Sequence, residues 1–148
     1  MPAINAEEYD ISVKDVGADD GTYKGVGCLL DLTGFLSKGS REVKVRECAN
    51  IGVDDEKSLK KIKYSDATVK YNFDPYDTAG KKALNDAYDS AKPVTIRIEL
   101  DDKDDGGTHG TYIERDCLVK EIVSDRGDDW EETANLELLS AYRLTVKA

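Results

Sequence analysis

The sequence has a single histidine in 148 residues, and this scarcity restricts the catalytic chemistry open to it. Catalysis of the Ser-His-Asp or Cys-His kind would have to use His109. That residue stands in the glycine-rich segment 106–110, where we expect a solvated loop histidine. A zinc site needs about four Cys, His or carboxylate ligands, which one histidine does not favour. Together with the lack of a Walker-type phosphate loop, this predicts that the chain is not an enzyme and binds no cofactor.

Cysteines are also few, and they stand far apart. The three, Cys28, Cys48 and Cys117, form no CxxC motif and cannot all pair with one another. Secreted disulfide scaffolds usually carry more cysteines in even numbers, so we expect three reduced, mostly buried thiols in a cytosolic protein.

Two further features are lacking: a signal peptide at residues 1–8 and an apolar run of the roughly 20 residues that a membrane span needs. We therefore expect a protein that is made in the cytoplasm, has no membrane partner and stays soluble until it assembles.

Charge is abundant and mostly negative. Charged residues make up 35% of the chain against 39% hydrophobic ones, and the net charge is −10. Double-stranded nucleic acid is bound by neutralising its phosphates with Lys and Arg, so an acidic surface disfavours tight binding. An acidic wall along which DNA passes without sticking stays compatible with this charge. The length fits a single domain, here taken as residues 1–148.

Most of the chain alternates apolar and polar residues, the pattern of half-buried strands. The clearest strand is 93–100, in which Val94, Ile96, Ile98 and Leu100 alternate with polar residues. The last run, 135–146, is longer than an ordinary strand, so we expect a bulge or bend near residues 139–141. The other strand candidates are 22–32, 43–46, 68–73 and 111–124.

One segment, about residues 78–91, has the period of an amphipathic helix instead. Asp77 is the expected N-cap, and Pro93 ends the helix and opens the next strand. The expected buried face consists of Ala79, Ala83, Leu84, Ala87, Tyr88 and Ala91. The expected solvated face consists of Lys81, Lys82, Asn85, Asp86 and Asp89. Many strands and one flanking helix predict a mainly β fold, a sandwich or partly closed barrel.

The acidic run at 101–105 suggests calcium but fails the EF-hand register. With Asp101 at position one, Lys103 falls on position three and Tyr112 on position twelve, where a bidentate Glu is required. A solvated hairpin tip is the default reading, and a weak cation site of another type is the alternative. Further acids at 54–56 and 128–132 lie in polar segments with no sign of a pocket that would raise a carboxyl pKa. For Trp130, an exposed contact and a ring tucked under the domain edge stay equally open.

The second half of the chain resembles the tail tube proteins of siphophages, bacteriophages with long non-contractile tails. The resemblance rests on an ordered series of segments that starts with a strand and a helix entry and ends with the closing strand. The segments are 69–75, 77–84, 93–100, 111–124 and 135–138. The resemblance implies a β-sandwich or barrel with one helix, assembled as hexameric rings that stack into a tube.

The resemblance also implies where subunits meet. The polar stretch 47–63 is expected to be an extended loop that contacts a neighbouring subunit, and 1–12 an N-terminal arm. The implied contact residues are Asn50, Ile51, Val53, Asp54, Asp55, Glu56 and Leu59. The implied lumen or tip acids are Asp101, Asp102, Asp104 and Asp105. Thr95, Arg97 and Glu99 face either the channel or bulk water.

The expected function is thus a structural subunit of the virion tail tube, through whose acidic channel DNA passes during genome ejection without specific binding. Its expected partners are further copies of itself and other tail proteins such as the tape measure, terminator and distal tail proteins. The alternatives are another ring-forming protein, such as a tail terminator or an injection-system tube, and a carbohydrate- or cation-binding β-sandwich.

Overall fold

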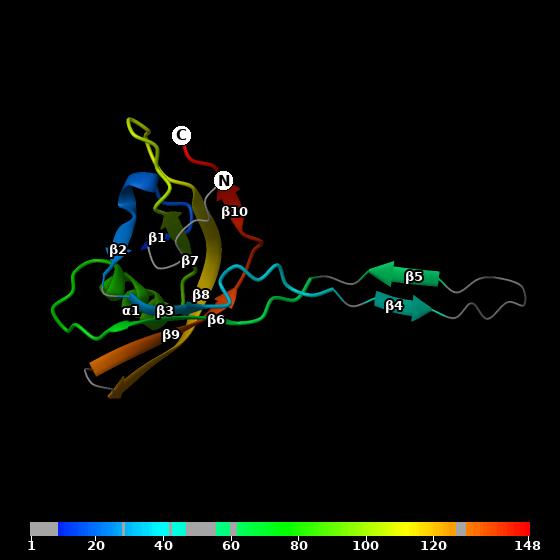
Figure 1. The fold of residues 1–148 in the computed structure, drawn as a ribbon. Helices are drawn as coiled ribbons and strands as arrows, with labels where there is room; N and C mark the ends of the chain where they lie inside the picture. Colours follow the sequence, from blue (N-terminus) through cyan, green and yellow to red (C-terminus); the bar gives the residue numbers. More distant parts are fainter. Residues whose placement is uncertain (1–8, 28, 42, 47–55, 60–61, 127–129) are drawn as a thin grey trace, which may run out of the picture.

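The computed structural model describes residues 9–27, 29–41, 43–46, 56–59, 62–126 and 130–148. These residues form ten strands, one α-helix and one short 3₁₀ helix (Figure 1). The strands are β1 (Tyr9–Asp15), β2 (Lys24–Val26), β3 (Leu29–Thr33), β4 (Val43–Arg46), β5 (Glu56–Leu59), β6 (Ala67–Asn72), β7 (Val94–Leu100), β8 (Tyr112–Arg126), β9 (Trp130–Leu138) and β10 (Arg143–Thr145). The helices are η1 (Asp20–Thr22) and α1 (Gly80–Ser90).

Eight of the strands form one antiparallel sheet in the order β2-β1-β7-β8-β9-β6-β3, with β10 paired to β8. The mainly β prediction is confirmed, and the sheet is not closed into a barrel. Strand β8 is long enough to pair with strands in two parts of the sheet. Its first half pairs with β7 and β10, and its second half pairs with β9.

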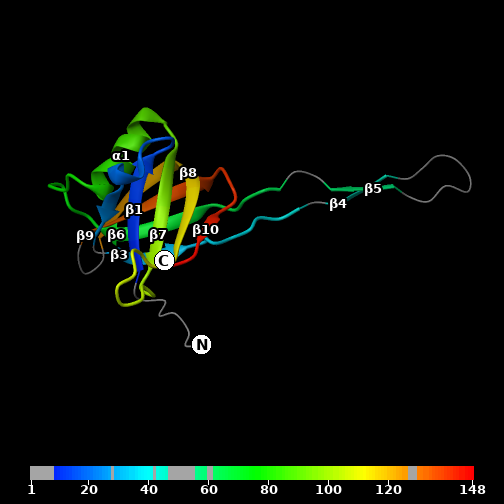
Figure 2. The ribbon, with the colours of Figure 1, turned by 90° about the horizontal axis from the view of Figure 1, so that it is seen from above.

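The sheet folds over on itself at β8 and makes two layers. A register shift between Val119 and Glu121 marks the bend. Strands β1 and β7 with the first half of β8 cross β3, β6 and β9 at a steep angle (Figures 1 and 2). We call these the β1–β7–β8 layer and the β3–β6–β9–β8 layer. Their facing sides enclose the core.

The core contains the inward-facing alternate residues of both layers, as the period-two pattern predicts. Val94, Ile96 and Ile98 of β7 are buried, which confirms the clearest strand of the sequence. The core continues with Ile11, Val13, Ala67, Val69, Tyr71, Ile113, Cys117, Val119, Ala134, Leu136 and Leu138. Cys117 is buried and free, as expected of a reduced thiol. Cys28 and Cys48 lie outside the described residues.

Helix α1 is confirmed, but its buried face is turned relative to the prediction. Leu84 and Ala87 are buried as expected, while Tyr88 is about half exposed. Lys81, predicted on the solvated face, is only 6% exposed, because its Nζ lies 5.8 Å from the centre of the Tyr71 ring. A long lysine stem buries its methylenes against the sheet while the ammonium contacts the aromatic ring.

The ends of α1 also differ in detail. The cap residue is Ala79, and it makes no side-chain capping bond. Asp77, two residues earlier, nevertheless acts on the first turn, because its Oδ2 accepts bonds from the backbone N–H groups of Ala79 (3.1 Å) and Lys82 (3.0 Å). The helix ends before Ala91, which adopts a left-handed conformation with φ 55°. In the part of the chain that the structure describes, no helix is long and apolar enough to cross a membrane.

The C-terminal run is two strands rather than one bent strand. Strand β9 ends at Leu138, where the bend was expected, and β10 begins at Arg143 on the other side of the turn. Leu144 and Val146 share the apolar phase but are more than half exposed. Leu144 lies on the short edge strand β10 and Val146 follows it, so the apolar alternation continues here without a core that covers these side chains.

Candidate subunit interface

A long hairpin arm leaves the body between β3 and β6 (Figures 1 and 2). We define the arm as residues 41–63 and its stem as residues 34–40 with 64–66. Within the arm, β4 and β5 pair antiparallel, with Val43 opposite Leu59 and Arg46 opposite Glu56. At the stem, Ser40 and Lys63 exchange two backbone hydrogen bonds of 2.8 Å. The arm is therefore a two-stranded ribbon that continues out of the β3–β6–β9–β8 layer.

The predicted contact loop falls on this arm. Glu56 and Leu59 are the first and last residues of β5. The other implied contact residues, Asn50, Ile51, Val53, Asp54 and Asp55, lie outside the described residues. The predicted N-terminal arm shares its last four residues, 9–12, with strand β1, and residues 1–8 lie outside the described part. The inter-subunit roles of both segments stay predictions.

A buried arginine holds the stem to the body. Arg115 points inward from β8 and is 0% exposed. Its Nη1 donates to the carbonyl oxygens of Phe35 (2.7 Å) and Ser37 (2.5 Å), and its Nε donates to the carbonyl of Ser140 (2.7 Å). Its guanidinium carbon lies 4.8 Å from the centre of the Tyr64 ring on the returning side of the stem. One side chain thus contacts both sides of the stem and the turn between β9 and β10.

Burial lowers the pKa of the Arg115 guanidinium, because the charged form loses its solvation. The positive charge of Arg115 is stabilised by the three backbone carbonyl groups that accept its hydrogen bonds, and not by a carboxylate of the described residues. Arg115 was not among the residues predicted from the sequence. The available signal was its place in the inward phase of β8, between Ile113 and Cys117, where a charged residue breaks the apolar alternation.

Gly39 lies where the two sides of the stem come close together. Gly39 has φ +80°, a conformation that side chains with a Cβ rarely adopt. A Cβ at this position would lie 2.6 Å from Cγ2 of Ile62 and 2.7 Å from the carbonyl oxygen of Lys63. The two sides of the stem approach this closely because Gly39 has no side chain.

The predicted tip acids occupy the turn between β7 and β8 and are partly engaged within it. Asp102 accepts bonds from the hydroxyl and the backbone N–H of Thr111, each 2.7 Å long, and these bonds lower the pKa of its carboxyl group. Asp104 pairs with Lys147 at 2.9 Å. Asp101 and Asp105 are exposed. Among the residues that the structure describes, no three His, Cys, Asp or Glu side chains gather as a metal site.

His109 lies beside this turn and is partly buried. Its Nδ1 is 2.7 Å from the carbonyl oxygen of Gly110, and its ring centre is 5.0 Å from that of Tyr112. His109 thus lies in a loop, as expected, but its side chain is only partly exposed, because it contacts the Gly110 carbonyl and the Tyr112 ring.

The outward side of the β3–β6–β9–β8 layer is strongly acidic, and we call it the acidic face. The strand registers place alternate residues of the four strands on this side. Six acids stand on it against two bases, and each base has an acidic partner. Lys70 pairs with Glu131 at 2.8 Å, and Lys120, at the bulge of β8, pairs with Asp66 at 2.5 Å. The acids are Asp31, Asp66, Glu121, Asp125, Glu131 and Glu137.

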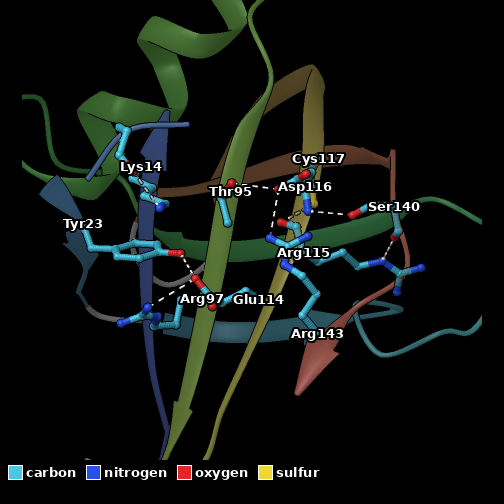
Figure 3. A network of polar contacts seen from close by, with 11 residues as sticks. Lys14, Tyr23, Thr95, Arg97, Glu114, Arg115, Asp116, Cys117, Ser140 and Arg143 are labelled. Atoms are coloured by element: carbon cyan, nitrogen blue, oxygen red, sulfur yellow. Dashed lines mark hydrogen bonds and ion pairs between the residues drawn. The ribbon is translucent and has the colours of Figure 1, made fainter. Parts of the chain in front are cut away.

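The outward side of the β1–β7–β8 layer is different, because several of its charges form ion pairs with one another (Figure 3). Arg97 lies between the rings of Tyr23 and Tyr112, 4.3 and 4.1 Å from their centres, and pairs with Glu114 at 3.2 Å. Glu114 also accepts the hydroxyl of Tyr23.

A second group continues this network toward β10. Asp116 accepts the hydroxyl of Thr95 at 2.8 Å and pairs with Arg143 at 3.2 Å. Thr95 and Arg97 of the polar phase thus belong to a largely neutralised network on one layer, whereas most of the excess negative charge lies on the other.

The same fold occurs in solved assemblies of tail tubes and contractile injection systems. The chain matches one from the SPP1 tail tube with TM-score 0.64 and 13% identity, covering 97% of this chain and 80% of that chain. It matches one from the extended sheath-tube complex of the extracellular contractile injection system PVC with TM-score 0.64 and 15% identity, covering 97% and 92%. It matches one from the sheath/tube terminator of that system with TM-score 0.60 and 14% identity, covering 99% of both.

At the level of sequence, no family model and no curated protein matches the chain. The identities to the solved structures are low, so the likeness is one of fold. It extends over nearly the whole chain, whereas the resemblance in sequence rested on segments after residue 68. The resemblance to tail tube proteins is confirmed for the fold: this chain has the architecture found in the SPP1 tail tube.

Proposed function

We propose that the chain is a non-catalytic structural subunit of a phage tail tube. In this proposal it forms hexameric rings that stack, and DNA passes through the channel during genome ejection. Its place is the virion tail, with the tape measure, terminator and distal tail proteins as partners. The fold shared with the SPP1 tail tube supports this assignment.

The observation that carries the proposal is a sheet layer with two open edges and an acidic outward face. Among the described strands, β3 pairs only with β6, and the second half of β8 pairs only with β9. An open edge presents unpaired N–H and C=O groups to a neighbouring chain. If β3 of one subunit pairs with β8 of the next, the layer continues from subunit to subunit, and a rotation that closes yields a ring.

The distribution of charge indicates which of the two sheet layers lines the channel. DNA carries one negative charge per about 1.7 Å of helix axis, so a wall that must let it slide should offer few cations. The acidic face meets this requirement, with six acids against Lys70 and Lys120, both of which are paired with a carboxylate. The neutralised network of the other layer contains three cationic side chains, Lys14, Arg97 and Arg143. We therefore assign the acidic face to the channel.

A second candidate is a terminating ring, favoured by the match to the sheath/tube terminator structure. A terminator would form one closed ring and would not add further copies at both ends. The tube and terminator proposals share the lateral contact and differ in axial stacking.

Electron microscopy of the purified protein over a range of concentrations tests these proposals. Hollow tubes with a regular axial repeat are expected, and single rings that never stack would favour the terminator. A reconstruction should show the β3–β6–β9–β8 layer along the bore. A bore lined by the β1–β7–β8 layer would contradict the assignment of the acidic face, and a monomer at every concentration, with tail extract as initiator, would contradict the tube.

A further inference from the structure

The inward side of the β3–β6–β9–β8 layer extends beyond its cover at the end away from the arm (Figure 1). Tyr71 of β6 is opposite Glu132 of β9, and both side chains are buried. Phe73 and Trp130 continue the same inward phase two residues further on, and the N–H of Phe73 donates to the carbonyl of Trp130 at 2.9 Å. Phe73 is 43% exposed and Trp130 is 59% exposed, so the core is open to solvent at this end.

A cavity of about 240 Å³ lies at this open end. Tyr71 and Phe73 line it from β6 and the residue after that strand, and Glu132 lines it from β9. Lys81 and Asn85 line it from the first half of α1. Pockets for drug-sized molecules measure about 300–1,000 Å³, so the size of this cavity suits a smaller ligand.

Lys81 brings a buried positive charge to the cavity. It is 6% exposed, and its Nζ lies 5.8 Å from the centre of the Tyr71 ring. That distance is close to the limit of about 6 Å for a cation–π contact, and the ring offers no lone pair to the three N–H donors of the ammonium. In the described part of the chain, this ammonium has no hydrogen-bond acceptor and no carboxylate partner. An anionic group in the cavity would therefore stabilise it, because an unpaired buried charge is costly.

Glu132 brings a buried negative charge to the same cavity. It is 4% exposed, and its Oε1 accepts the hydroxyl of Tyr71 at 2.5 Å and the side-chain amide of Asn85 at 2.9 Å. Its Oε2 accepts only the hydroxyl of Ser124, over a long distance of 3.5 Å. Neutral donors thus hold one oxygen of this carboxylate in place, and the other oxygen can accept a stronger bond from a cationic donor.

Three more charged residues line the cavity, namely Asp74, Asp77 and Lys82. Both aspartates already accept backbone N–H groups, Asp74 through Oδ1 and Asp77 through Oδ2. The ammonium of Lys82 pairs with Asp86 at 2.7 Å, and both of these side chains are exposed. Lys81 and Glu132 are thus the two buried charges of the lining, one of each sign, and they do not pair with each other.

We propose that this cavity binds a small zwitterion of the α-amino acid class. The carboxylate of the ligand pairs with the ammonium of Lys81, and the ammonium of the ligand donates to Oε2 of Glu132. An apolar side chain of the ligand lies against Phe73, where it displaces water from the ring. The carboxylates of the lining repel a simple anion and Lys81 repels a simple cation, so a molecule that carries both charges fits best. This site belongs to the single subunit and goes beyond the proposed structural function.

Ligand analogues test the charge pattern on the unchanged protein. The melting temperature is first measured with each of the common α-amino acids at millimolar concentration, because a ligand that binds only the folded state raises it. The amino acid with the largest effect is then titrated by calorimetry, beside its amide, which lacks the carboxylate, and its N-acetyl derivative, which lacks the ammonium. We expect an apolar amino acid to bind and each analogue to bind at least about tenfold more weakly, since each lacks one charge-assisted bond.

Matched substitutions locate the site on the chain. Lys81→Met keeps an apolar stem and removes the ammonium, whereas Glu132→Gln keeps an acceptor and removes the charge. Each should weaken the binding of the amino acid at least about tenfold. Lys92→Met and Glu137→Gln make the same changes at exposed positions and should leave the affinity unchanged. Phe73→Ala should reduce the preference for large apolar side chains over glycine, because only large side chains reach the ring.

Three results would overturn the inference: no binding of any α-amino acid, analogues that bind as tightly as the free amino acid, or unchanged affinity in Lys81→Met. If a cavity variant fails to fold, the analogues on the unchanged protein still decide the outcome. None of these measurements depends on assembly. A protein that forms tubes but binds no amino acid refutes this inference alone, and a protein that binds an amino acid but forms no rings or tubes refutes the proposed function alone.

Discussion

Nη1 of Arg115 lies 2.7 Å from the carbonyl oxygen of Phe35, so a strand in the middle of the sheet is bonded directly to the stem of the arm. The same guanidinium reaches Ser37 and Ser140. The direction in which the arm leaves the body is therefore fixed from inside the core. A stem that is held in place before assembly loses less conformational freedom on binding, which favours contacts with a neighbouring subunit next to it.

Replacing Arg115 by Met should destabilise the protein by about 3 kcal/mol, because buried carbonyl groups lose their donor and each such loss costs about 1–3 kcal/mol. Urea denaturation measures the change. Arg143→Met is the matched control: its pair with Asp116 is half exposed and should contribute at most about 1 kcal/mol. Equal losses in the two variants would contradict the role of Arg115 at the stem.

Gly39→Ala should destabilise more than Gly17→Ala. Both glycines have positive φ, +80° and +83°, so both substitutions carry the conformational cost of about 1–2 kcal/mol. Only at Gly39 does the new Cβ also collide with the opposite side of the stem, whereas nothing lies within 4 Å at Gly17. We expect a further loss of about 1–3 kcal/mol from overpacking, seen as a larger fall in the free energy of unfolding. Equal losses of unfolding free energy in the two variants would show that the stem shifts to accommodate the added methyl group.

Cys117 should make the stability of the protein fall at alkaline pH, because its thiol ionises more readily in the unfolded chain. Burial raises the pKa of its thiol to about 12, above the usual value of about 8.5 for an unfolded chain. Above that usual value the unfolded state releases the thiol proton and the folded state keeps it, so stability falls as pH rises from about 8.5 to 12. One pH unit above the unfolded pKa, the loss should be about 1.4 kcal/mol.

The measurement compares Cys117 with Cys117→Ala in a Cys28→Ser, Cys48→Ser background. The alanine variant should lack this component of the alkaline loss, while lysine and tyrosine titrations affect both chains equally. A thiol reagent at pH 8 should react with Cys117 only as fast as the protein opens. Rapid reaction in the folded state would contradict the burial of this residue.

Removal of the arm should leave the body folded. Strands β4 and β5 pair with each other, and the ribbon extends beyond the body (Figure 1). Replacing residues 42–61 by Asn-Gly joins the stem through a two-residue hairpin turn next to the Ser40–Lys63 bridge. We expect the far-ultraviolet spectrum of the body to persist and the melting temperature to change by only a few degrees, while tubes are lost. Cooperative unfolding at room temperature would show instead that the arm is part of the folding unit.

Most strands and the helix could be predicted from the sequence, although β1 was expected to be part of an N-terminal arm and β5 part of a loop. Alternation at 93–100 predicted β7 with its buried face, and the bend near 139–141 falls where β9 ends, because period two follows directly from strand geometry. The helix was found from its period, yet its face was misassigned at Lys81, since burial of a lysine stem depends on the Tyr71 ring opposite it. The acids at 101–105 were recognised as a turn, but their partners, Thr111 and Lys147, come from other elements.

How these elements pack together could be seen only in the folded chain. It folded β8 between two layers, separated an acidic face from a neutralised one, and showed Trp130 exposed where the sequence left it open. It also brought Arg115 to Phe35, a pairing across 80 positions that no local pattern encodes. The physical reason is the same in each case: periodicity reports which side of an element is apolar, whereas partners and charges on the assembled faces depend on long-range packing.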